Sequence, residues 1–550
     1  MRLRLWVIIR MKNYKVLADC RGMEEQEIID TILSNRGIKD VEHFLNPKRD
    51  DFIFCDKLAK IDEAYKLYRD AIDGNKKIIL LADTDTDGLT AGTILTRYTR
   101  EIQKYPCECL INNGKAHGLN GQDLSRFTGA DLLIIVDSLD STVDNYIRLK
   151  REYGVENIIV LDHHKIDDNV QYNEHITLVS SQRDYENKSL SGAGVVYKFI
   201  CYCEEQESID ISDAEQYADL AACGILADVM DVSEDNYENR YIVNLGLNNL
   251  TNLGIKKILG GYDFNSKAVL FSIAPLFNAA VRVGENEAAL QLLLTDDNKE
   301  LLALKKVLEH CKELQNEEKE RLLPDVRKQF DAQTDSIIKV GIINTPYGIS
   351  GLIANTLLEE YKCPILVLND CGDVFAGSMR SIGYGDFAWL INQTRLAEAH
   401  GHEEAAGFTC KADDLEECIF DLNAMLSNME QYVDKEYVID AEINVSDMTR
   451  NLAYLIRRVN FVSGNGFKPL TFKVGNVTEY GINSWSSGKH LLIEPTNEIK
   501  FIQWNTKLDF DKMEEHALIG DEVEVIGELE DGFVGRNYII KLIIDDLKVG

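Results

Sequence analysis

Short apolar runs alternate with helix-like stretches through the first third of the chain. The runs are rich in Ile, Val and Leu, and polar residues follow each of them. They cover residues 77–82, 132–136, 158–161 and 176–179. Strands that are buried on both faces read as continuous apolar runs, so this alternation predicts a parallel sheet built from β-α-β units.

The apolar pattern changes to a helical spacing after residue 285. Apolar side chains recur every three or four residues among many charges, as at Leu301, Leu304, Leu308 and Cys311. This spacing predicts one or two long helices over residues 287–335. Because the stretch lies between two α/β patterns, we expect it to connect two lobes.

Strand-like runs return in the second half of the chain. Runs near 337–343 and 364–368 predict a second α/β lobe, and short strands with turns after about residue 437 predict a small β-barrel. The expected fold class is α/β, with two α/β lobes joined by a long helix and followed by the barrel. The expected parts are a catalytic lobe with an N-terminal extension (1–285), a connecting helix (286–335), a second lobe (336–432) and the barrel (433–550).

The charge balance bears on the substrate. The chain has 59 Lys and Arg against 92 Asp and Glu, which gives a net charge of −33. A protein that binds a polyanion usually carries a basic surface, so any nucleic-acid contact must be local. The acidic balance fits a site that gathers divalent cations with carboxylates.

The cysteines and the hydropathy bear on location. The 12 cysteines include no C-x-x-C pair, which favours reduced thiols in a cytoplasmic protein. No uninterrupted apolar run reaches membrane-spanning length, so we expect no membrane partner.

Four acidic motifs lie where apolar runs end. In chain order they are Ala82-Asp83-Thr84-Asp85-Thr86-Asp87-Gly88, then Asp137, then Asp162-His163-His164, and finally Asp228 after an apolar helical run. Each has an ordinary explanation by itself, because acidic runs form solvated turns and single aspartates cap helices. In open α/β sheets, however, ligands bind outside the carboxyl ends of the strands, where three of these motifs would meet.

The residue types suit a particular cofactor. Carboxylates with one or two imidazoles favour Mn²⁺ or Mg²⁺ over a metal that prefers thiolates. The carboxylates are numerous enough to hold two divalent cations, which together activate water and stabilise charge on a phosphoryl group.

The order of these motifs resembles that of the DHH phosphoesterases. Further segments resemble the RecJ exonuclease branch of that superfamily. They are Asn35-Arg36-Gly37-Ile38, Phe44-Leu45-Asn46-Pro47, Asn278-Ala279-Ala280 with Arg282, Gly377-Ser378-Met379-Arg380-Ser381, Gly401-His402 with Ala405-Ala406-Gly407, and Gly464-Asn465-Gly466 before Pro469. The resemblance covers nearly the whole chain. It implies a DHH lobe, a DHH-associated lobe and an oligonucleotide-binding (OB)-like barrel.

The resemblance also implies roles for individual residues. The implied metal ligands are Asp83, Asp85, Asp137, His163 and Asp228. The implied catalytic groups are Asp87, Asp162, His164, Arg380 and His402. The implied substrate-binding residues are Lys115, Asn278, Arg282, Ser378, Arg380, Gly401, His402 and Trp504. For Trp504, stacking on a base and filling the barrel core are both open.

The chain departs from the family pattern at three places. His400 replaces the first glycine of a Gly-Gly-His signature, and Val281 replaces a glycine beside Arg282. Gly114 lies where the family has an arginine that holds a 5′ phosphate, with Lys115 next to it. A lysine point charge does not reproduce the guanidinium fork, so these changes affect recognition of the strand end rather than the metal motifs.

We therefore expect a metal-dependent single-stranded DNA exonuclease that works 5′ to 3′, in DNA repair, recombination or replication. RNA is an alternative substrate, a single-strand-binding protein or helicase is a candidate partner, and the expected state is a monomer. The alternative functions are a phosphodiesterase for short oligonucleotides or cyclic dinucleotides, a non-catalytic RecJ-like DNA-binding subunit, and a pyrophosphatase.

Overall fold

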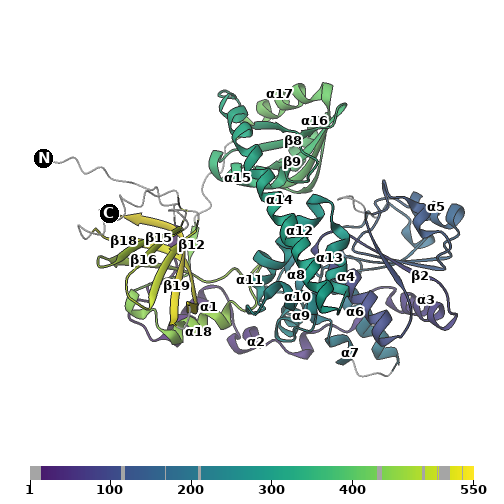
Figure 1. The fold of residues 1–550 in the computed structure, drawn as a ribbon, viewed down its shortest axis with the longest axis horizontal. Coiled ribbons are helices and arrows are strands. Elements are labelled where there is room, and N and C mark those ends of the chain that lie inside the picture. Colours follow the sequence, from purple (N-terminus) through teal and green to yellow (C-terminus); the bar gives the residue numbers. More distant parts are fainter. Residues whose placement is uncertain are drawn as a thin grey trace.

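The computed structural model places three bodies around one long helix (Figure 1). A catalytic lobe contains the strand β2, a second lobe lies above the helix α14, and a sheet-rich body holds the C-terminal strands. The structure describes residues 14–112, 118–167, 169–207, 212–429, 437–485, 490–504, 506, 521–534 and 537–549.

The catalytic lobe is built on a five-stranded parallel sheet. Its order is β3-β2-β4-β5-β6, and every neighbouring pair is parallel. The strands are β2 (Ile78–Ala82), β3 (Glu108–Ile111), β4 (Leu132–Val136), β5 (Asn157–Asp162) and β6 (Thr177–Ser180). The order reverses between β2 and β4, and ligands of open α/β sheets bind at such a reversal. The predicted parallel sheet is confirmed.

Helices cover both faces of this sheet, which explains the unbroken apolar runs. In β2, Leu80 packs into the core under the helices α3, α4, α6 and α8, whereas Leu81 packs on the opposite face. The helices of this lobe are α3 (Ile61–Asp73), α4 (Thr86–Arg97), α5 (Asp144–Tyr153), α6 (Gly192–Glu207), α7 (Ser212–Glu215), α8 (Ala218–Ala227), α9 (Tyr237–Asn248) and α10 (Leu253–Leu259). Because both faces are covered, polar groups of the strands reach solvent only at the strand ends.

The connecting segment is helical, as predicted. It comprises α13 (Asn286–Leu294) and the 34-residue α14 (Asn298–Asp331). The two helices are separate because the side chain of Asp297 accepts hydrogen bonds from the backbone N–H groups of Lys299 and Glu300, which caps a new helix.

A continuous helical run precedes this connector. It consists of α11 (Ser266–Ala268), a wider turn over Val269–Ile273, and α12 (Ala274–Val283). By length and apolar composition alone, it is the single candidate membrane span among the described helices. Val269, Ile273 and Phe277 from it are buried in the catalytic-lobe core, so its apolar character has a packing explanation here.

The second lobe carries a mixed five-stranded sheet, which confirms a second α/β lobe. The order is β10-β11-β9-β8-β7, with only β7 and β8 parallel. The strands are β7 (Lys339–Ile343), β8 (Ile365–Asp370), β9 (Val374–Arg380), β10 (Ala397–His402) and β11 (Ala405–Lys411). The helices are α15 (Ser350–Tyr361), α16 (Phe387–Thr394) and α17 (Leu415–Leu426).

The C-terminal body contains a seven-stranded mixed sheet in the order β13-β14-β18-β19-β17-β16-β15. Its elements are β12 (Tyr437–Ile439), β13 (Ala441–Ile443), α18 (Arg450–Val459), β14 (Thr471–Val477), β15 (Gly481–Trp485), β16 (His490–Glu494), β17 (Ile499–Gln503), β18 (Val523–Val534) and β19 (Asn537–Val549). The predicted strands are present. In the described residues no pairing joins β13 to β15, and the OB-like assignment stays a prediction.

The N-terminal extension packs into this C-terminal body. The strand β1 (Tyr14–Val16) pairs in parallel with β12, and α1 (Glu25–Asn35) packs on α18. The Arg36 guanidinium donates to both carboxylate oxygens of Asp440 at 2.7 Å. The sequence analysis grouped this extension with the catalytic lobe, because an apolar helix face does not specify its partner.

One buried arginine joins three distant segments. Arg240 on α9 is 1% exposed and donates to the carbonyl oxygens of Phe44 (2.7 Å), Val232 (2.9 Å) and Val462 (3.1 Å). Phe44 belongs to α2 (Val41–Leu45), and its ring lies 3.4 Å below the guanidinium carbon. Burial lowers the pKa of Arg240 to about 9, so the group stays charged at neutral pH.

Arg240→Met should lower the denaturation midpoint substantially. The variant leaves three carbonyl oxygens without their donor, and each unsatisfied buried group costs about 1–3 kcal/mol. Arg321→Met is the matched control, because Arg321 is an exposed side chain that pairs with Glu318 on the same helix. Such surface pairs contribute about 0–1 kcal/mol. Equal midpoints for the two variants in thermal denaturation would contradict the junction role.

Candidate metal centre

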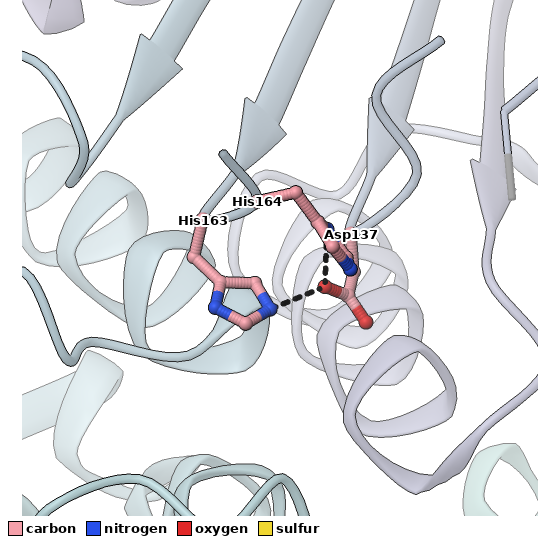
Figure 2. Close-up of side chains that lie close together, drawn as sticks. All are labelled: Asp137, His163 and His164. Atoms are coloured by element: carbon pink, nitrogen blue, oxygen red, sulfur yellow. Dashed lines mark ion pairs between the residues drawn. The ribbon is translucent and has the colours of Figure 1, made fainter. Parts of the chain in front are cut away.

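The acidic motifs meet at the carboxyl edge of the parallel sheet. Asp83 directly follows β2, Asp137 directly follows β4, and Asp162 is the last residue of β5. Figure 2 shows Asp137 beside His163 and His164, at the ends of neighbouring strands. This edge contains the point where the strand order reverses, which is where the sequence predicted the site.

His163 lies among three carboxylates. Its Nε2 atom is 3.2 Å from Oδ1 of Asp137, 3.4 Å from Oδ2 of Asp228 and 3.8 Å from Oδ2 of Asp87. Asp228 comes from the end of the helix α8 rather than from the sheet. The helix and the sheet edge therefore build one cluster.

The candidate ligand atoms form three overlapping groups. Within each group they lie no more than 4.8 Å apart. The groups are Asp83 with Asp85 and Asp137, Asp137 with His163 and His164, and Asp87 with His163 and Asp228. Because Asp137 and His163 each belong to two groups, the cluster is continuous and its donor set suits more than one divalent cation. The ligand roles of these residues stay predictions.

Asp137 carries the strongest electrostatic tension in the cluster. Burial, followed by the charges of Asp87, Asp85, Asp162 and Asp83, raises the pKa of its carboxyl well above the usual range. Its Oδ1 atom is buried and accepts no hydrogen bond from the described residues. Buried like charges are unfavourable unless a cation compensates them, so this environment fits an oxygen-preferring divalent cation.

Asp162 and His164 form a pair at the side of the cluster. One Asp162 oxygen accepts from the His164 backbone N–H at 2.6 Å and lies 3.1 Å from His164 Nδ1. The other accepts from the Leu139 N–H at 2.8 Å. Burial opposes ionisation of Asp162, but the His164 charge prevails and holds the pKa of Asp162 well below its usual range. The Asp162 charge raises the pKa of His164 to about 10, so Asp162 orients this imidazole.

Two other aspartates of the cluster cap helices. Asp85 accepts from the Gly88 N–H at 3.0 Å and begins α4. Asp87 accepts from the N–H groups of Gly192 (2.7 Å) and Ala193 (3.0 Å) at the start of α6. A helix N-terminus stabilises a negative charge, so these contacts keep carboxylates ionised beside their neighbours.

Three glycines make room for the carboxylates. A Cβ atom on Gly88 would lie 2.6 Å from the Asp83 Cβ, and one on Gly192 would lie 2.5 Å from Asp137 Oδ1. A Cβ on Gly224 would lie 2.2 Å from Asp87 Oδ1. The sequence analysis identified Gly88 but missed Gly192 and Gly224, which lie in apolar helices far from the motifs along the chain.

The sequence analysis also missed an amide beside the cluster. The Asn112 side chain follows β3 and donates to Ser138 Oγ at 2.8 Å and to Asp83 Oδ1 at 3.4 Å. Its place immediately after a strand, like that of Asp137, is the signal that could have identified it. Lys115, a predicted substrate-binding residue, lies outside the described residues.

The predicted second-lobe residues gather at one end of their sheet. Arg380 pairs with Ala405 and Ser378 pairs with Gly407 across β9 and β11, while Gly401 and His402 end the neighbouring β10. Gly401 has a φ of 140°, and a Cβ there would lie 2.9 Å from the Ala406 Cα. The sheet register therefore brings these four residues to a common edge.

Two arginines approach each other between the lobes. Arg282 on α12 donates to Gln315 Oε1 at 2.9 Å, and its carbonyl oxygen accepts from the Gly348 N–H of the second lobe. Burial, followed by the charge of Arg380, lowers the pKa of Arg282. Asn278 lies half-buried one turn earlier on α12.

Trp504 lies in a groove between the C-terminal body and the catalytic lobe. The indole is 51% exposed, which excludes the core-filling alternative. The groove has a volume of about 1250 Å³, and Tyr262 and Phe271 from the catalytic lobe also line it. Its charges are mixed, since Lys267 pairs with Glu528 and Glu530 across the groove.

Comparison with known proteins agrees with this geometry. Residues 77–225 match the DHH family, N-terminal domain. The SPbeta prophage protein YorK of Bacillus subtilis strain 168, provisionally named a single-strand DNA-specific exonuclease, is 31% identical over 427 residues, covering 70% of this chain and 72% of YorK. The single-stranded-DNA-specific exonuclease RecJ of the same strain is 26% identical over 585 residues, covering 99% of this chain and 71% of RecJ.

Solved structures show the same fold. RecJ of Thermus thermophilus in complex with Mn²⁺ has a TM-score of 0.73 at 24% identity, covering 98% of this chain and 79% of that one. An exonuclease RecJ bound to manganese has a TM-score of 0.57 at 26% identity, covering 68% of this chain and 96% of that one. The chain therefore belongs to the RecJ-like branch of the DHH family. The predicted resemblance is confirmed.

Gly192→Ala should weaken divalent-cation binding at least about 10-fold, the loss typical when a group that supports metal ligands is disturbed. The added methyl would displace the Asp137 carboxylate, and calorimetric titration with Mn²⁺ measures the effect. Gly194→Ala is the control, since its Cβ would instead meet Leu190 Cδ1 at 2.5 Å. Similar cation affinities for the two variants would contradict the assigned role of Gly192.

Proposed function

We propose that this protein is a divalent-metal-dependent exonuclease that degrades single-stranded DNA from its 5′ end and releases nucleotides. One observation carries the proposal: six aspartates and two histidines from four motifs converge at the strand-order reversal of the sheet. The RecJ names of its relatives support the substrate class. The 5′-to-3′ direction rests on the RecJ-like motif pattern alone.

Mn²⁺ or Mg²⁺ is the proposed cofactor, and relatives of known structure hold these ions. The proposed ligands are Asp83, Asp85, Asp137, His163 and Asp228. Two such cations supply a water nucleophile at neutral pH and stabilise the charge that develops on a phosphoryl group. Asp162 fixes the orientation of His164, which leaves the imidazolium facing the cluster as a hydrogen-bond donor to phosphate.

The second lobe offers a cradle for an anion. Ser350 begins the 12-residue helix α15, and its hydroxyl lies 2.9 Å from that of Ser378. A Cβ on Gly351 would lie 3.0 Å from Nη2 of Arg380, so glycine leaves space beside the guanidinium. Arg282 approaches from the other lobe, and two neighbouring guanidinium groups favour a phosphate between them.

The groove that contains Trp504 is the proposed path of the strand. Exposed aromatic side chains provide stacking surfaces for bases, and the path needs few unpaired cations if stacking supplies most of the affinity. This also accounts for single-strand binding by a chain with a net charge of −33. A monomeric state, and recruitment of a single-strand-binding protein or helicase, stay predictions.

The decisive experiment compares the natural protein with Asp137→Asn on single-stranded DNA labelled at either the 5′ or the 3′ end, with Mn²⁺. The natural protein should release labelled nucleotide first from the 5′ label. Asp137→Asn should lose more than the roughly 100-fold that follows loss of a group outside the ligand set.

Asp131→Asn is the matched control, because Asp131 precedes the opposite end of the same strand, where it accepts from the Lys77 N–H at 2.7 Å. It should retain activity. Release from the 3′ label first would reverse the proposed direction. DNA binding without cleavage by the natural protein would instead favour a non-catalytic subunit.

Trp504→Ala should raise the KM for long strands about 10-fold, since stacking of one base contributes about 1–3 kcal/mol. Turnover of a dinucleotide, which is too short to reach the groove from the metal centre, should not change. Trp389→Ala is the control, because Trp389 is a comparably exposed indole on the second lobe. An unchanged KM for long strands would remove Trp504 from the proposed path.

A further inference from the structure

The helix that carries Asp228 ends in a strained turn. The Met230 N–H donates to the Ile225 carbonyl at 3.0 Å, which is the long bond of a Schellman-type helix end. The residue inside this turn is Val229, with a φ of 57°. Glycine usually occupies such a left-handed position, and a β-branched side chain is unfavourable there. The backbone next to Asp228 therefore needs support from its surroundings.

That support comes from the segment that leads into the C-terminal strands. The Asn465 side-chain amide donates to the Val229 carbonyl oxygen at 2.9 Å. The Asn465 carbonyl oxygen accepts from the Val232 N–H at 3.0 Å, and Asp231 and Asn465 form a parallel β-bridge. One asparagine thus binds the turn on both sides of Asp231.

The glycines that flank Asn465 permit this close approach. Gly466 has a φ of 77°, and a Cβ atom on it would lie 2.1 Å from Asp231 Oδ1. A Cβ on Gly464 would lie 3.3 Å from Val232 Cγ2. From the other side, the Asn239 amide donates to the Asp231 carbonyl at 2.9 Å, and Ser189 Oγ accepts from the Asp231 N–H at 2.9 Å. The turn is held between the catalytic lobe and the C-terminal segment.

We propose that Asn465 is a positioning residue that holds the Asp228 carboxylate in the cation site through the Val229 carbonyl, so that cation affinity depends on docking of the C-terminal body. The inference rests on the proposed function, in which Asp228 is a metal ligand. It does not require Asn465 to touch cation or substrate. It makes the Gly464–Gly466 segment part of the catalytic machinery, although these residues lie 236 positions from the turn along the chain.

The test measures Mn²⁺ affinity of the full chain by calorimetry. Asn465→Ala should weaken binding about 10-fold or more, as expected for a residue that orients a metal ligand. Val229→Gly introduced into Asn465→Ala should restore most of the affinity, because glycine adopts the left-handed conformation without strain. If the alanine variant does not fold, Asn465→Asp replaces it, because aspartate keeps the shape and removes the amide donor.

Ser266→Ala separates positioning from general destabilisation. Ser266 Oγ donates to the Phe461 carbonyl at 3.0 Å and accepts from the Ser463 N–H at 3.1 Å, so it joins the catalytic lobe to the same segment without touching the turn. It should lower the thermal midpoint and leave Mn²⁺ affinity within about twofold. Equal affinities for the natural protein and the folded Asn465 variant would overturn this inference alone. If the natural protein shows no Mn²⁺ binding that is lost in Asp228→Asn, the proposed function fails as well.

Discussion

The crowding of buried carboxylates at one sheet edge is the constraint on which the rest of the structure depends. Asp137 is surrounded by like charges and carries a buried oxygen without a hydrogen-bond donor among the described residues. Such an arrangement persists only if the surrounding fold prevents the groups from separating. The capping contacts of Asp85 and Asp87 and the close glycine at 192 provide that restraint. Stability and chemistry therefore compete for the same groups.

The restraint extends to segments far from the sheet. Arg240 binds carbonyl oxygens from three regions of the chain, and Asn465 binds the turn beside Asp228. Both use backbone oxygens as acceptors, so the contacts depend on chain path rather than on partner side chains. The C-terminal body is thus tied to the catalytic lobe at points that also shape the catalytic edge.

The sequence could predict the parallel sheet and most of the cluster, because apolar runs mark buried strands and the carboxyl ends of parallel strands share an edge. It could not predict Gly192 or Gly224, whose contacts arise only when helices pack over that edge. It also could not assign α1 to the C-terminal body, since an apolar helix face fits many partners. The exposure of Trp504 required the strand register, which no local pattern specifies.

The shared core of α1 and the C-terminal strands has a consequence for synthesis on the ribosome. Ile28 and Ile32 of α1 pack with Leu452 and Ile456 of α18, more than 400 positions later. At roughly 5–20 residues per second, α1 leaves the ribosome about 20–80 seconds before its partner exists. During that interval its apolar face has no native cover, while the catalytic sheet already has all its strands. The nascent chain therefore holds a folded catalytic lobe beside an N-terminal helix that still needs protection from aggregation.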